Sequence, residues 1–414
     1  MARENVDADK LARSLAAARQ LDRSLQAFSR IFDPPLQTGR ADRAFVAKDN
    51  FDVCGLATYA GNRQPVIEKA TKHAQAVDRL MHAGFALLGR TRMPQLAYGG
   101  SGASQIEPTP LNPRDSSIAR LPGGSSSGSA VAVAAGIIDI ALGTDTGGSV
   151  RIPASLCGVV GFKPTRTSFP LQGVFPLAPS LDTVGVLTRD VATAQACWQL
   201  LQDRSDHSRS RAASMPAAGR IAVARLDSSW ECSPDVSRAL ETRAESLRRA
   251  GYSVETQTLP WAPFTIHASS SVVLAYEAWQ LHGRMLDDPA VVFDPVIARR
   301  LQSGRSISAA DYAAALRQRE LDQLAQHRWL ESFDALLLPT TPVTAPAVGS
   351  FDENSAILSR FTRAATWLDV PAISLPAGQD CHGLPMGIQL MTHPQRERQC
   401  LEIAATLESA DPYT

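Results

Sequence analysis

The sequence predicts an α/β protein built on one mixed β-sheet. Three observations support this prediction: helical and strand-like segments alternate along the chain, apolar strand-like runs recur as late as residues 387–391, and 44% of the 414 residues are apolar. Alternation of helices with strands is typical of an α/β architecture, and this apolar content is enough to bury a large core. We expect a single sheet because the late apolar runs need strands to pair with.

The first half of the chain is expected to supply two helices and then the centre of the sheet. Residues 7–30 and 64–83 carry apolar side chains near helical spacing. Gly84 follows the second of these segments as a typical helix stop. The next segments are expected to be a buried strand, a tightly packed helix of small residues and a central strand, at residues 85–89, 130–136 and 137–142.

The second half of the chain begins with a predicted linker. Residues 204–219 are rich in Ser, Arg and Ala without apolar periodicity, which indicates a mobile surface connection. A strand, a helix and a strand are expected beyond it, at residues 221–224, 234–250 and 252–258. Three later apolar runs are expected to join the sheet as strands, at residues 335–338, 372–375 and 387–391.

Composition and charge exclude several functions. The 41 basic and 41 acidic side chains cancel, so no net charge attracts the chain to nucleic acid or to an anionic membrane. The longest apolar stretch, residues 130–142, is interrupted by Gly136 and Asp139 and is shorter than the roughly 20 residues that span a bilayer. Residues 1–10 are charged, unlike a secretory signal. We therefore expect a cytoplasmic protein.

The six cysteines, widely scattered along the chain, also limit the possibilities. They form no CxxC or CxxH spacing, so the sequence predicts neither a zinc site nor a disulfide framework. Buried free thiols are the expected state of these residues.

The residues that suggest chemistry lie between Gly123 and Thr165. Two loops rich in glycine and serine, GGSSSGSA at 123–130 and GTDTGGSVR at 143–151, flank the expected small-residue helix and central strand. Backbone N–H groups in such loops can bind an anion or a developing oxyanion. Either loop alone would also fit a flexible linker or a phosphate-binding turn.

Known nucleotide and hydrolase motifs do not explain these loops. No Walker sequence, dinucleotide fingerprint or GxSxG elbow is present, and all eight histidines lie outside residues 123–165. A Ser-His-Asp triad assembled from distant residues stays open. If a serine in this segment is a nucleophile, however, lysine is the better candidate for its base.

Taken whole, the segment resembles the amidase signature family of serine amide hydrolases and amidotransferase subunits. The similarity includes PASLCGVVGFKPT at 153–165 and extends upstream to residues 46–52. It continues downstream at 180–185, 338–342 and 383–389. The resemblance implies a single large α/β domain whose mixed sheet is covered by helices on both faces, and it implies no metal and no cofactor.

The resemblance also divides the chain into expected parts of one amidase domain, residues 1–414. Residues 1–60 would hold the N-terminal helix and the strand that carries the family's lysine. Residues 61–203 would form the signature core, 204–219 the linker, and 220–414 the remainder of the same sheet with its helices.

Three residues match the family's catalytic groups. Ser149 matches the nucleophile, Ser125 the serine that relays its proton, and Lys48 the base. The resemblance also implies a cis peptide bond between Gly124 and Ser125. Lys48 can accept a proton only when it is neutral, so burial must lower its pKa from the usual value of about 10.4. The expected oxyanion hole consists of main-chain N–H groups of four residues: Thr146, Gly147, Gly148 and Ser149.

Further residues around the loops have expected supporting roles. Ser126 is expected to hydrogen-bond within the catalytic group, and Asp145 to brace the second loop. Arg151 is expected either to fix that loop or to face the substrate. Lys163 is expected to support a strand end rather than to serve as a second base.

The residues that choose the substrate are harder to identify. Arg300 loosely matches an arginine that some relatives use on a carboxylated substrate, although a surface salt bridge is the preferred interpretation. Tyr98 and Trp367 are candidate pocket walls or plain core residues. Two segments that would line the acyl pocket depart from the family pattern: residues 92–111, with Gln95 in place of the usual acid, and residues 366–369.

The sequence therefore predicts an amidase that hydrolyses the C–N bond of a small carboxamide or urea-like compound. The alternative is a glutaminase-type component of an amidotransferase that delivers ammonia to a partner, similar to the A subunit of glutamyl-tRNA(Gln) amidotransferase. A binding protein that has lost catalysis is a third hypothesis, disfavoured because Lys48, Ser125 and Ser149 are all present. The expected partner is a small-molecule amide, and a homodimer stays open.

Overall fold

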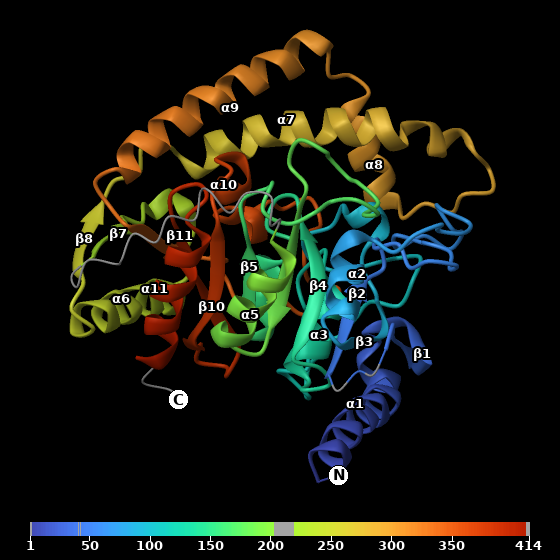
Figure 1. Ribbon diagram of the computed structural model, residues 1–414. Coiled ribbons are helices and arrows are strands. Elements are labelled where there is room, and N and C mark those ends of the chain that lie inside the picture. The colour runs from blue at the N-terminus through green and yellow to red at the C-terminus, as the bar shows by residue number, and fades with distance from the viewer. Residues whose placement is uncertain (1, 40, 42, 203–218, 411–414) are drawn as a thin grey trace.

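An 11-stranded mixed sheet runs through the computed structural model, which describes residues 2–39, 41, 43–202 and 219–410 (Figure 1). Its strand order is β1-β3-β2-β4-β6-β5-β10-β11-β9-β7-β8. The prediction of one mixed sheet is therefore confirmed, and both halves of the chain contribute to it. Residues 204–218 of the predicted linker lie outside the described residues.

The strands, in chain order, are β1 (Phe28–Leu36), β2 (Arg43–Lys48), β3 (Phe85–Thr91), β4 (Ile140–Asp145), β5 (Val160–Lys163), β6 (Thr183–Thr188), β7 (Arg220–Ala224), β8 (Ser253–Gln257), β9 (Ala335–Pro339), β10 (Ala372–Gln379) and β11 (Pro385–Met391). The α-helices are α1 (Ala2–Leu25), α2 (Gln75–His82), α3 (Ser127–Ala134), α4 (Arg151–Cys157), α5 (Val191–Leu201), α6 (Pro234–Arg249), α7 (Pro263–His282), α8 (Pro295–Gly304), α9 (Ala309–Leu330), α10 (Thr362–Trp367) and α11 (Glu397–Ser409). Short 3₁₀ helices include η1 (Gln95–Ala97) and η5 (Ile357–Ser359).

Helices cover both faces of the sheet, as predicted. Alternate strand residues point to opposite faces: Phe45 and Ala47 of β2 join a core with α2, α5, α6 and α11, whereas Ala44 and Val46 join a core with α1, α3 and α4. The other end of this second face is covered by α7, α8, α9 and α10, and Figure 1 shows α7 and α9 along the upper side of the molecule.

The pairing of β2 and β4 positions the candidate site. β2 is parallel to both of its neighbours, β3 and β4, with Ala47 opposite Leu142. The carboxyl ends of β2 and β4 therefore lie at the same edge of the sheet. This arrangement brings Lys48, the last residue of β2, beside the segment that starts the second glycine-rich loop.

The predicted helix at residues 64–83 is wrong over its first half, because α2 starts only at Gln75. Pro65 disfavours helical backbone at the residue before it. The main chain of residues 66–70 instead bonds to an earlier segment: Val66 N–H donates to the Thr58 carbonyl at 2.8 Å, and Ala70 N–H donates to the Leu56 carbonyl at 2.9 Å. Apolar spacing alone does not reveal this pairing.

The predicted helix at residues 7–30 also extends too far. α1 ends at Leu25, Gln26 has a left-handed φ of 53°, and Phe28 begins β1. β1 was not foreseen, because its sequence contains Asp33, Pro34 and Pro35, which are disfavoured in strands. It pairs on one side with β3, at the edge of the sheet, where such residues are tolerated.

All six cysteines are free, as expected, but they are not all buried. Cys157, Cys197 and Cys400 are buried, Cys232 is half-buried, and Cys54 and Cys381 are exposed. Within the described part of the chain, no helix combines the length and apolar character needed to cross a membrane.

Candidate active site

Lys48 lies fully buried at the carboxyl end of β2. Its Nζ donates hydrogen bonds of 2.7 Å to Ser125 Oγ and of 2.7 Å to Thr144 Oγ1. Burial lowers the pKa of Lys48 from 10.5 to about 7, although Asp182 and Asp145 act in the opposite direction. A large fraction of Lys48 is therefore neutral near pH 7, and its amine can accept a proton from a hydroxyl group.

Ser125 stands in the first glycine-rich loop, and its peptide bond with Gly124 is cis. Its side chain is fully buried, with Lys48 Nζ as a partner. Residue 124 must be small, because a Cβ there would lie 2.6 Å from the Gly99 carbonyl oxygen. The next residue joins the two loops, since Ser126 N–H donates to the Ser149 carbonyl at 3.0 Å.

Ser126 differs from its expected role. Its hydroxyl donates to the Thr144 carbonyl at 3.2 Å and accepts from Thr144 N–H at 3.3 Å. It therefore fixes the main chain at the end of β4 rather than hydrogen-bonding to Lys48 or Ser125. Thr144 in turn touches Lys48, a role that the sequence analysis missed although Thr144 lies within the quoted motif.

The second loop is organised around the buried carboxylate of Asp145. This carboxylate accepts from Gly148 N–H at 2.7 Å and from Val150 N–H at 3.2 Å. Arg151, also fully buried, donates to it from Nε at 3.0 Å and from Nη2 at 2.9 Å. Burial acts to raise the pKa of Asp145, but the Arg151 guanidinium, the Lys163 charge and the Val150 N–H together outweigh it, so the pKa is lowered.

Arg151 fixes the loop and does not line the cavity. Its remaining contacts are Gln389 Oε1 at 2.9 Å and Thr366 Oγ1 at 3.1 Å. Thr366 belongs to the segment 366–369, which was expected to approach the acyl pocket. In the structure this segment contacts the loop through Thr366 and Arg151. None of its residues lines the cavity.

In the part of the chain that the structure describes, three main-chain donors of the loop are without a partner. The Gly148 N–H, one of the four expected oxyanion donors, is taken by Asp145. The N–H groups of Thr146, Gly147 and Ser149 have no hydrogen-bond partner among the described residues. Thr362 Oγ1 donates a hydrogen bond of 2.7 Å to the Gly147 carbonyl. A Cβ at residue 148, where φ is 127°, would lie 2.1 Å from Thr362 Oγ1.

These elements open onto a cavity of about 450 Å³. Ser149, Thr146 and Gly147 line it on one side, and residues 97–101 line it on another. Further walls come from α7, α8 and α10 and from residues 351–359. A cavity of this size suits a small molecule.

The structure separates the residues proposed for substrate contact. Tyr98 and Arg300 line the cavity, whereas Trp367 does not, because it is fully buried and donates from Nε1 to Asp322 at 2.8 Å. Arg300 is partly exposed and forms a salt bridge, as expected, although it also lines the cavity. It donates to the Tyr98 carbonyl at 2.6 Å, and its guanidinium lies 3.8 Å from the Glu353 carboxylate.

Gln95 does not line the cavity either. It is fully buried and donates from Nε2 to Asn62 Oδ1 at 2.8 Å and to the Val292 carbonyl at 3.0 Å. It also accepts from Asp294 N–H at 2.9 Å. The side chain thus links η1 to the segment that leads into α8. Gln95, which stands where the family usually has an acidic residue, therefore has a structural role.

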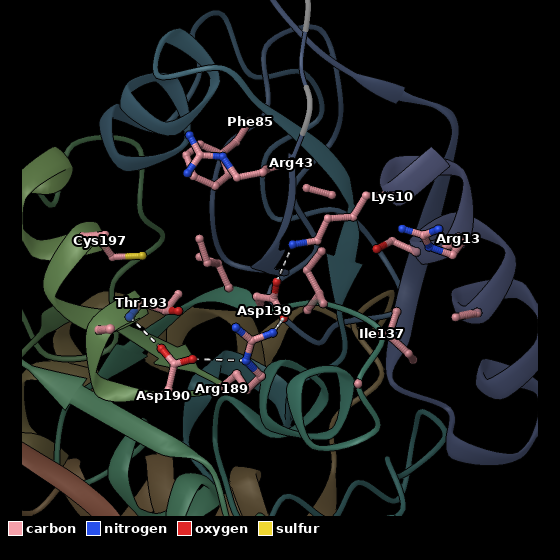
Figure 2. A pocket seen from close by; sticks show the side chains of 18 of the residues that line it. Lys10, Arg13, Arg43, Phe85, Ile137, Asp139, Arg189, Asp190, Thr193 and Cys197 are labelled. Carbon is pink, nitrogen blue, oxygen red and sulfur yellow. Dashed lines mark hydrogen bonds and ion pairs between the residues drawn. The ribbon is translucent and has the colours of Figure 1, made fainter. Parts of the chain in front are cut away.

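A second cavity, of about 660 Å³, lies at the opposite end of the strands, where Ile140 begins β4 (Figure 2). Four of its charged groups form ion pairs: Asp139 binds Lys10 and Arg189 at 2.9 Å each, and Arg189 also binds Asp190 at 3.1 Å. Burial raises the pKa of Cys197, which lines this cavity, to about 12. The thiol of Cys197 is therefore not an activated nucleophile.

Comparison with known proteins shows the family to which the chain belongs. Residues 42–401 match the sequence model of the family described as Amidase. The chain belongs to the amidase family. Its fold and its family make it a hydrolase that acts on carbon–nitrogen bonds.

Named relatives of this amidase-family chain include two kinds of protein. It is 31% identical to the 2-amino-5-chloromuconic acid deaminase of Comamonas testosteroni, over 87% of this chain and 80% of the deaminase. It is also 31% identical to the A subunit of the glutamyl-tRNA(Gln) amidotransferase of Thermotoga maritima, over 88% of this chain and 84% of that relative.

Solved structures agree with the fold over nearly the whole chain. The crystal structure of an amidase superposes with a TM-score of 0.85 at 29% identity, covering 97% of this chain and 95% of the amidase. The crystal structure of the Thermotoga maritima amidotransferase relative superposes with a TM-score of 0.82 at 30% identity, covering 98% of this chain and 92% of the other.

Proposed function

We propose that the protein is an amidase that hydrolyses the C–N bond of a small carboxamide or urea-like substrate through an acyl-enzyme on Ser149. The observation that carries this proposal is a fully buried lysine within hydrogen-bond distance of Ser125. Lys48, with a pKa of about 7, contacts Ser125 at 2.7 Å, and the loop that contains Ser125 is bonded to Ser149.

In the proposed acylation step, the Ser149 hydroxyl attacks the amide carbon while its proton passes to Ser125 and the Ser125 proton passes to Lys48. A C–O bond forms, and the carbonyl oxygen becomes an oxyanion. The free N–H groups of Thr146, Gly147 and Ser149 are the donors proposed for this oxyanion. Losing one such donor typically costs about 3 kcal/mol of transition-state stabilisation.

Collapse of the tetrahedral intermediate then breaks the C–N bond. The proton held by Lys48 returns through Ser125 to the leaving nitrogen, so ammonia or an amine departs neutral. In the second half of the reaction, water attacks the ester at Ser149 and gives its proton to the same relay. The bond between the acyl carbon and Ser149 Oγ then breaks, the relay returns the proton to Ser149 Oγ, and the carboxylic or carbamic acid is released. General acid–base assistance of this kind typically contributes about 10²- to 10⁴-fold to the rate.

Two features of the chain support a small substrate. The cavity holds about 450 Å³, and the Comamonas testosteroni relative is a deaminase of 2-amino-5-chloromuconic acid. Release of ammonia from a small compound fits both observations.

Ammonia release from a panel of aliphatic, aromatic and urea-like amides tests the proposed activity, with the purified chain and its Ser149→Ala variant. We expect the chain to hydrolyse at least one amide and the variant to hydrolyse none above the uncatalysed rate. Equal turnover by the variant would show that Ser149 is not the nucleophile.

A second candidate function is that of a glutaminase-type component which passes ammonia to a partner. It is favoured by the several glutamyl-tRNA(Gln) amidotransferase chains among the relatives, at 29–33% identity. This role requires a partner protein, whereas the amidase role does not. Turnover of a small amide by the purified chain alone would favour the amidase, and activity that appears only after a partner is added would favour the amidotransferase role.

A further inference from the structure

Arg363, on α10, places a positive charge inside the catalytic cavity. Its Nη1 donates to Ser270 Oγ at 3.2 Å and to Ser271 Oγ at 3.0 Å, and its Nε donates to Ser359 Oγ at 3.4 Å. All three acceptors are uncharged hydroxyls. Nη2 has no hydrogen-bond partner among the described residues.

The charge of Arg363 is not neutralised by the protein. Among the residues that the structure describes, no Asp or Glu forms an ion pair with it, whereas Arg300 has Glu353 at 3.8 Å and Arg360 has Glu231 at 2.8 Å. Burial lowers the pKa of Arg363 to about 10, and Arg300 contributes to this shift. The group still carries its charge at neutral pH, and a sheltered charge without a counter-ion is costly.

The other titratable groups of the cavity add no compensating negative charge. Burial, together with the charges of Arg363 and Arg360, lowers the pKa of His267 to about 3, so this histidine is neutral. Glu353 is engaged with Arg300, and burial raises its pKa. The cavity therefore carries a net positive charge centred on Arg363.

Arg363 also lies close to the place where the substrate carbonyl would bind. A Cβ built on Gly147 would lie 3.6 Å from Arg363 Cγ and 3.8 Å from its Nε. The preceding residue, Thr362, holds the Gly147 carbonyl at 2.7 Å. The guanidinium thus flanks the loop of the free N–H groups, and Ser149 follows only two residues later in that loop.

We propose that Arg363 binds a carboxylate of the substrate, which makes the substrate class small amides that carry a carboxylate, such as the monoamides of dicarboxylic acids. This inference rests on the proposed function of Ser149. The free Nη2 of the guanidinium would donate a charge-assisted hydrogen bond to the carboxylate. Arg300 is the weaker candidate, because its guanidinium is already committed to two carbonyls and to Glu353.

The test compares monoamides with the matching diamides, which differ in charge but hardly in shape. The Ser149→Ala variant is titrated calorimetrically with succinamic, glutaramic and adipamic acids and with the three corresponding diamides, so that binding is measured without turnover. We expect at least one monoamide to bind at least tenfold more tightly than its diamide.

The same titrations are then made with Arg363→Met added to Ser149→Ala. Affinity for the preferred monoamide is expected to fall about 100-fold, as for the loss of a charge-assisted hydrogen bond, while affinity for its diamide changes less than about threefold. Arg363→Lys keeps the positive charge but not the planar guanidinium. Its affinity for the preferred monoamide should therefore lie between those measured with Arg363 and with Arg363→Met. The matched control is Arg360→Met, three residues away and outside the cavity, which should leave the preference intact.

The inference is overturned if none of the three monoamides binds more tightly than its diamide, or if Arg363→Met weakens both ligands equally. These results are independent of the proposed chemistry. That chemistry fails instead if the wild-type protein does not react at Ser149 with a fluorophosphonate, a reagent that labels activated serines.

Discussion

The protonation of Lys48 gives the sharpest prediction for this protein. Burial removes water from the ammonium group and lowers its pKa to about 7. In the proposed mechanism, acylation of Ser149 requires the neutral amine, so the rate is expected to rise with pH as Lys48 loses its proton. With this pKa, the neutral fraction is about 9% at pH 6 and about 91% at pH 8, so the rate should rise about tenfold between these values and then level off.

The assay is the rate of covalent labelling by a fluorophosphonate, followed by intact-mass spectrometry from pH 5.5 to pH 9.5. This reagent does not titrate in that range, so the profile reports the protein. The Lys48→Met variant should lose most of the rate and the midpoint near pH 7 together. A flat profile between pH 6 and pH 8, or one that Lys48→Met leaves unchanged, would refute the reasoning.

Lys163 provides the necessary control. Burial lowers the pKa of this second buried lysine to about 8, and its Nζ donates to the Pro164 carbonyl at 2.7 Å. If the midpoint lay near pH 8 and disappeared in Lys163→Met, the titrating group would be Lys163 rather than Lys48. We expect Lys163→Met to leave the midpoint in place.

Three further predictions concern the support of the two loops. Arg151→Met should lower the free energy of unfolding by about 3–5 kcal/mol, because it leaves the Asp145 carboxylate buried without its partner; urea unfolding measures this, and a loss below about 1 kcal/mol would contradict it. Gly148→Ala should abolish labelling of Ser149 because its Cβ would lie 2.1 Å from Thr362 Oγ1, and a variant labelled at the wild-type rate would show that the loop tolerates the displacement. Ser125→Ala should reduce the labelling rate at least about 100-fold while the melting temperature stays close to that of the wild type, and a normal rate would exclude a proton relay through this hydroxyl.

The fold and the centre of the candidate site were predictable from the sequence because they depend on local patterns. The apolar runs identified most inner strands, and the motif around residues 123–165 carried the family resemblance. Lys48 could be named at a separation of 77 residues from Ser125 because its strand had a recognisable sequence. The catalytic roles of Lys48, Ser125 and Ser149 stay predictions until they are measured.

What could not be predicted depends on contacts between distant segments. Residues 66–70 have apolar side chains at helical spacing, but their main chain bonds to residues 56–58 instead of forming a helix. Contacts with that earlier segment decide the outcome, and the local spacing does not reveal them. The N–H of Gly148 is taken by Asp145 because the loop folds back on itself. Arg363 lies in no motif, and only the packing of α10 against the loop brings it into the cavity.

The most direct test of the account is the site of fluorophosphonate labelling. Wild-type protein and its Ser149→Ala variant are incubated with the reagent at pH 8, measured by intact mass and then mapped by peptide fragmentation. The account predicts one adduct per chain on the wild type, located on Ser149, and none on the variant. An adduct on another residue, or an unlabelled wild type, would contradict it.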